Sequence, residues 1–77
     1  MRSLNTIARE IKTDWGNKVN YGAKPYLDCM LALDSINDNY GFDSARSVVS
    51  YFLANARTWK GEVAKRVKLE LNTMLKG

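Results

Sequence analysis

Three aspartates come closest to a catalytic set in this sequence. Asp34 and Asp38 lie four residues apart, and Asp43 follows a short turn. Paired carboxylates can share general acid and base roles when their environments separate their pKa values. Asp is also favoured at turns and helix ends, because its side chain accepts hydrogen bonds from nearby backbone amides. The chain has no histidine to serve as a partner base, so we predict that these aspartates cap the backbone.

The segment from Asn37 to Gly41 superficially resembles a calcium-binding loop. Such a loop needs an oxygen ligand at its first position, glycine at its sixth and glutamate at its twelfth. Placing Gly41 at the sixth position puts Ile36 at the first and Ser47 at the twelfth. Neither residue suits its role, so the sequence predicts no metal site.

Cys29 is the only cysteine, which excludes an intramolecular disulfide and a cysteine-based zinc cage. Its apolar neighbours predict a buried thiol that fills space in the core. The five glycines are dispersed along the chain and form no phosphate-binding loop. We therefore expect a protein that uses no cofactor and is not an enzyme.

The basic residues favour binding over catalysis. Twelve Lys and Arg residues against eight Asp and Glu residues give a net charge of +4. Much of the excess lies in the C-terminal half, from which Lys60, Lys65 and Lys68 are selected as candidate partner contacts. Such a face can neutralise phosphates. A pair between Glu62 and Arg66 at helical spacing would instead mark it as a solvated surface.

Aromatic residues cluster near the predicted loops and helix ends. Trp and Tyr often anchor interfaces because they bury a large area with few torsions to freeze. In a small bundle the same residues often close the ends of the core. The sequence leaves both readings open, and the candidates for an exposed anchor are Tyr21, Tyr40 and Trp59.

Apolar residues at spacings of three and four predict the elements that position these side chains. They indicate helices over 4–15, from Pro25 to about Ile36, and over 44–56. A final helix turns Val63, Val67, Leu71 and Met74 inward. The helical pattern allows this helix to begin as early as Thr58, with Gly61 inside its first turn. A strand over 47–52 is the weaker alternative. The predicted fold is all-α: one domain over 1–77, a small compact bundle of three to four short amphipathic helices.

Local signals support the ends of these helices. Ser3 and either Asp43 or Ser44 can cap helix starts, and Pro25 suits a first helical turn. Gly16 suits a helix C-terminus. No apolar run is long enough to span a membrane. Charges at Arg9, Glu10 and Lys12 interrupt any signal peptide, so we expect a cytoplasmic protein.

Most of the chain resembles a group of small uncharacterised proteins. The resemblance is carried by Tyr21–Leu27, by the segment Leu33–Ala56 with its run Asn37-Asp38-Asn39-Tyr40-Gly41-Phe42, and by Thr58–Glu62 with Arg66. These residues resemble small proteins encoded by bacteriophages and prophages. The resemblance carries no catalytic motif and implies no site residues.

The resemblance implies a setting in the bacterial host cell. Small phage proteins without catalytic residues often occupy a surface on a host machine, and inhibitors of host defence such as anti-CRISPR proteins are one example. We therefore expect binding to a host protein or ribonucleoprotein. The alternative is a basic helical protein that binds nucleic acid directly. The net charge of +4 argues against overall mimicry of DNA.

Overall fold

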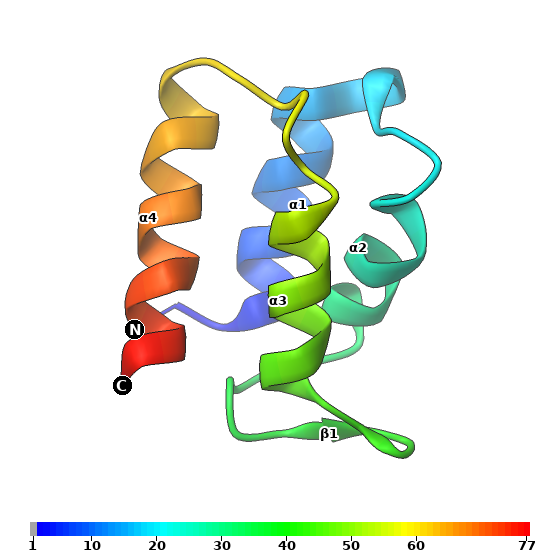
Figure 1. The fold of residues 1–77 in the computed structure, drawn as a ribbon, viewed down its shortest axis with the longest axis vertical. Coiled ribbons are helices and arrows are strands. Elements are labelled where there is room, and N and C mark those ends of the chain that lie inside the picture. Colours follow the sequence, from blue (N-terminus) through cyan, green and yellow to red (C-terminus); the bar gives the residue numbers. More distant parts are fainter. Residues whose placement is uncertain (1) are drawn as a thin grey trace.

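Four helices and one small hairpin form the structure, a computed structural model that describes residues 2–77. The helices are α1 (Leu4–Trp15), α2 (Lys24–Leu31), α3 (Ala45–Ala54) and α4 (Glu62–Lys76), and a 3-10 turn, η1 (Gly16–Lys18), follows α1. Helices α1 and α3 each contact both α2 and α4, which lie on opposite sides of the molecule (Figure 1). The hairpin closes the lower end of this arrangement.

Several predicted helix ends are confirmed. Ser3 caps α1, because its Oγ accepts a hydrogen bond from the Thr6 amide at 3.3 Å. Ser44 caps α3 by accepting from the Ser47 amide at 3.1 Å. Gly16 follows α1 with a φ of 63°, a conformation that glycine adopts without steric cost. The segment 47–52 is helical, so the weaker strand alternative is wrong.

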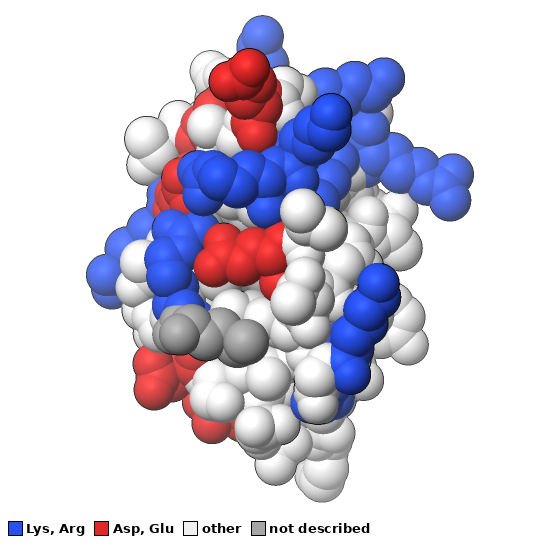
Figure 2. Space-filling view, turned by 90° about the vertical axis from the view of Figure 1, so that its left-hand side faces the viewer, with Lys and Arg blue, Asp and Glu red and all other residues white. Residues whose placement is uncertain are grey.

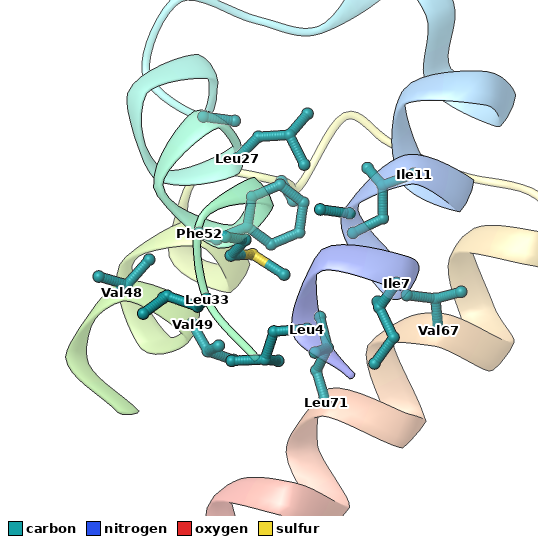
Figure 3. Packing of buried hydrophobic residues seen from close by; sticks show 14 of the residues in the cluster. Leu4, Ile7, Ile11, Leu27, Leu33, Val48, Val49, Phe52, Val67 and Leu71 are labelled. Carbon is teal, nitrogen blue, oxygen red and sulfur yellow. The ribbon is translucent and has the colours of Figure 1, made fainter. Parts of the chain in front are cut away.

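The helices share one contiguous hydrophobic core (Figure 3). Ile7 and Ile11 of α1 face Val67 and Leu71 of α4, and Phe52 of α3 lies between α1 and α2. The largest side chains that are fully buried are Phe52, Leu4, Ile7, Ile11, Leu27, Met30, Leu71, Val49 and Val67. Burial of such side chains contributes roughly 1.5–3 kcal/mol each, so this cluster is the main source of stability.

The second helix ends earlier than the sequence predicts, at Leu31 and not near Ile36. The chain leaves the helical conformation after Leu31, and the carbonyls of the residues that follow accept hydrogen bonds from the start of α1. The amide of Leu4 donates to the Asp34 carbonyl at 2.8 Å, and the amide of Asn5 donates to the Leu33 carbonyl at 3.0 Å. These bonds satisfy two of the amides that every helix start leaves without an internal partner.

The prediction of an all-α fold holds for the four helices but misses a two-stranded antiparallel sheet. Strands β1 (Asn39–Tyr40) and β2 (Asp43–Ser44) pair with Tyr40 opposite Asp43. The two-residue loop places Gly41 first, with a φ of 61°, while Phe42 keeps a negative φ. These signs are those of a type II′ turn, which matches the twist of a hairpin.

Helix α4 begins at Glu62, so the prediction that the last helix could begin at Thr58 is wrong. Gly61 lies outside the helix with a φ of 114°, which is accessible to glycine but strained for other residues. No helix within residues 2–77 has the length and apolar character needed to cross a bilayer.

Candidate functional site

Trp59 lies in the core, so it cannot act as an exposed anchor. Its side chain is only 2% exposed. The ring stacks on Trp15 with 5.6 Å between centroids and meets Phe52 edge-on at 6.4 Å. Its Nε1 donates to Asp14 Oδ2 at 2.9 Å. Trp59 therefore closes the end of the core where α1 finishes and α4 begins, with its polar atom satisfied.

Lys60, Lys65 and Lys68 come together around Trp59. The three lysines line one shallow hollow with Trp59, Gly61 and Ala64. Lys60 also borders a neighbouring hollow with Lys18 and Thr58. Viewed from the α4 side, Lys and Arg atoms crowd the upper half of the molecule around a few acidic atoms (Figure 2). The structure thus gathers these residues into what we call the basic end, formed by Lys18, Lys60, Lys65 and Lys68.

Lys68 contacts the core residue Trp59 and is therefore less available to a partner than its neighbours. Its Nζ donates to the Trp59 carbonyl at 2.6 Å and lies 5.9 Å from the centre of the Trp59 ring. Burial lowers the pKa of Lys68, and the charge on nearby Lys60 lowers it further. Lys60 and Lys65 are exposed, so they are the freer cations of the basic end.

The side of α4 that faces the N-terminus carries an ion network that the sequence did not predict. Arg2 pairs with Glu70 at 2.6 Å and with Glu10 at 2.8 Å, and Glu10 also pairs with Arg66. The hydrogen bonds from Arg66 and then Arg2 lower the pKa of Glu10. The anticipated pair between Glu62 and Arg66 does not form, because Arg66 turns to α1.

Tyr21 and Tyr40 lie at separate places. Tyr21 is 95% exposed in the turn that precedes α2. This turn rests against the end of α3, where Asn20 Nδ2 donates to the Asn55 carbonyl at 2.7 Å. Tyr40 is in the hairpin and is 44% exposed. The six predicted contact residues therefore do not form one site.

Phe42 is the most exposed large apolar side chain that the structure describes, and it was not among the selected contacts. It sits beside Gly41 in the hairpin loop, where it is fully exposed. The hairpin loop extends toward the side of α2, away from α4 (Figure 1). The sequence signal that could have found it is a glycine between two aromatic residues, which suits a two-residue hairpin loop.

A second pair of aromatic rings lies where α2 meets α3. Tyr26 and Tyr51 stack with 5.4 Å between ring centroids, and Tyr51 is 55% exposed. Cys29 follows Tyr26 by one helical turn. Burial raises the pKa of the Cys29 thiol, with smaller contributions from Asp43 and Asp28.

The hairpin leads directly into α3 (Ala45–Ala54) at the lower end of the molecule (Figure 1). We call the exposed side chains of the hairpin, Tyr40, Phe42 and Asp43, the aromatic face. Apolar and aromatic side chains exposed together commonly mark protein-interaction sites.

Within residues 2–77, no three His, Cys, Asp or Glu side chains gather as a metal site would require. Asp38 has the predicted capping role, since its Oδ2 accepts from the amides of Asp34 at 3.0 Å and Ser35 at 2.9 Å. Comparisons with protein-family models, with curated proteins and with solved structures find no match to this chain.

Proposed function

We propose that this chain is a non-enzymatic, phage-type accessory protein that binds a host protein through its aromatic face. The observation that carries the proposal is the fully exposed Phe42 at the end of the hairpin. Burying this ring against a partner would recover roughly 1.5–3 kcal/mol.

The shape of the aromatic face suits recognition of a protein surface. The type II′ turn holds Phe42 on a short and regular loop, so little conformational freedom is lost when its ring enters a pocket. A bacterial host, and inhibition of a defence ribonucleoprotein in the manner of anti-CRISPR proteins, are proposed from the resemblance to phage proteins.

The test compares proteins captured from a bacterial host lysate by the wild-type chain and by two variants. Phe42→Ala removes the exposed ring of the aromatic face. Leu69→Ala is the matched control, because Leu69 is 69% exposed on α4, away from that face. We expect a host protein to be retained by the wild type and Leu69→Ala and lost by Phe42→Ala. Equal capture by all three chains, or recovery of nucleic acid alone, contradicts the proposal.

A second candidate function, binding of nucleic acid, is favoured by the grouping of Lys18, Lys60 and Lys65 at the basic end. Phosphate neutralisation by these cations would give affinity that falls steeply with salt. Asp14 also lines the hollow beside Lys60, and Glu62 opens α4, so the positive potential is reduced.

Duplex DNA at about 50 mM salt tests this candidate, since phosphate-driven binding is strong under that condition. The double variant Lys60→Ala with Lys65→Ala should weaken binding. Lys76→Ala, at the other end of α4, should change it little. Negligible affinity of the wild-type chain removes nucleic-acid binding from consideration.

A further inference from the structure

We infer that the hairpin receives an arginine-bearing, basic segment of the partner protein. This inference rests on the proposed function and names the chemistry of the partner. Its starting point is the distribution of charge along the chain. Residues 25–45 contain four aspartates and no Lys or Arg, whereas all twelve basic residues lie outside that segment.

Among those four aspartates, Asp43 is the one that lies in the hairpin, and its carboxylate makes no hydrogen bond or ion pair with another residue in 2–77. Asp38 is engaged by backbone amides, and Asp28 pairs with Lys24 at 3.4 Å. Asp34 lines a different hollow, beside Arg2. Asp43 is exposed and forms no ion pair with any residue of the described part of the chain.

Asp43 stands next to aromatic rings. It is the register partner of Tyr40, and directly opposed residues of an antiparallel pair project on the same face of the ribbon. Phe42 precedes it in the loop. A carboxylate beside aromatic faces matches the guanidinium group, which bonds a carboxylate through two parallel N–H groups and stacks on rings.

The nearest basic side chain belonging to α3 is turned elsewhere. Arg46 donates to the Leu75 carbonyl at 2.9 Å and to Asn37 Oδ1 at 3.5 Å. It therefore leaves Asp43 unpaired. The Asp43 carboxylate itself disfavours phosphates and acidic protein surfaces, so charge complementarity selects a basic protein segment as the occupant of this face.

The experiment is an NMR titration of the full chain with a short arginine-rich peptide. A second peptide carries citrulline in place of every arginine, which keeps the shape of the side chain and removes its charge. We expect amide shifts centred on Tyr40, Phe42 and Asp43 with the arginine peptide only. Shifts centred on α4, or equal binding of the citrulline peptide, overturn the inference.

Matched variants separate a docking site from general attraction to acidic residues. Asp43→Asn should weaken the peptide about tenfold, the scale of a charge-assisted hydrogen bond. Asp34→Asn removes the same charge outside the hairpin and should change affinity less than about twofold, as expected for an exposed, screened charge. Equal losses for the two variants mean that net charge alone attracts the peptide, and they overturn the inference.

The captured host protein distinguishes failure of this inference from failure of the proposed function. If binding of that protein is lost with Phe42→Ala and also weakened by Asp43→Asn, both stand. If it is lost with Phe42→Ala but unchanged by Asp43→Asn, the aromatic face binds a partner without arginine there. In that case the proposed function stands and the inference fails.

Discussion

The α4 side and the hairpin use the same kinds of residue in opposite ways. Trp59, next to α4, is buried between other rings with its Nε1 bonded to Asp14. Phe42 and Asp43, in the hairpin, have neither a covering surface nor an ionic partner among residues 2–77. The contrast separates groups that hold the fold together from groups that remain free for a partner.

Charged groups follow the same division. Arg2, Glu10, Arg66 and Glu70 form one network that links the N-terminal segment and α1 to α4. A network of this kind is more effective than isolated surface pairs. The substitutions below therefore should cost stability on the α4 side and leave it unchanged at the hairpin.

The largest expected effect is that of Trp59→Ala. Removing a buried aromatic side chain leaves a cavity and costs about 3–5 kcal/mol of unfolding free energy. Chemical denaturation followed by circular dichroism measures this loss. A loss below about 1 kcal/mol would mean that Trp59 does not support the core, and the division between the two regions would then fail.

Asp14→Ala should have the next largest effect. It leaves the Trp59 Nε1 donor without its partner, which costs about 1–3 kcal/mol. Asp14→Asn is the matched control, because the amide oxygen can still accept the bond. Thermal unfolding should rank the wild type, Asp14→Asn and Asp14→Ala in order of decreasing stability, and equal stability of the two variants would contradict this role for the hydrogen bond.

Glu10→Gln tests the ion network and its dependence on pH. Contacts with Arg66 and Arg2 lower the pKa of Glu10 in the folded chain. Its stabilising contribution is therefore present above the pKa of the unfolded chain and is lost as the pH falls through the folded value. We expect a loss of about 1 kcal/mol at neutral pH.

The difference between the wild type and Glu10→Gln should shrink as the pH falls below about 4.3, the ordinary pKa of a glutamate. Denaturant titrations at several pH values measure it. Asp34→Asn serves as the control, because Asp34 forms no ion pair within residues 2–77. A difference for Glu10→Gln that stays constant with pH would show that the network does not stabilise the ionised carboxylate.

Phe42→Ala should have the smallest effect on stability. Its ring is fully exposed, and substitutions at such positions usually stay within about 0.5 kcal/mol. The same variant should abolish capture of the host partner. Thermal unfolding measures the first effect, and a substantial drop in stability would show that Phe42 supports the hairpin itself.

The sequence correctly predicts those helix ends whose signals lie in neighbouring residues. The ends of α1 and the start of α3 follow from Ser3, Gly16 and Ser44, which act within one turn of themselves. The early end of α2 could not be predicted in this way, because the Leu33 and Asp34 carbonyls accept hydrogen bonds from the amides of Asn5 and Leu4, which are 28 and 30 residues away. The hairpin was missed because its strands contain only two residues each, too few to show a period.

The candidate site was predicted only in part, again for reasons of distance along the chain. The grouping of Lys60, Lys65 and Lys68 follows from nearness in sequence. The burial of Trp59 depends on Trp15 and Asp14, which lie far away in the chain. Likewise, Arg66 selects Glu10 over the nearer Glu62 because α1 and α4 are packed together.

The bonds between the start of α1 and the segment after α2 also have a dynamic consequence. The amides of Leu4 and Asn5 donate to the carbonyls of Asp34 and Leu33, at the base of the loop that leads into the hairpin. Their hydrogen exchange with solvent requires that these two segments separate. A partner that immobilises the hairpin loop should therefore slow exchange at Leu4 and Asn5, giving a signal of binding near the N-terminal end of the chain, far from the hairpin in sequence.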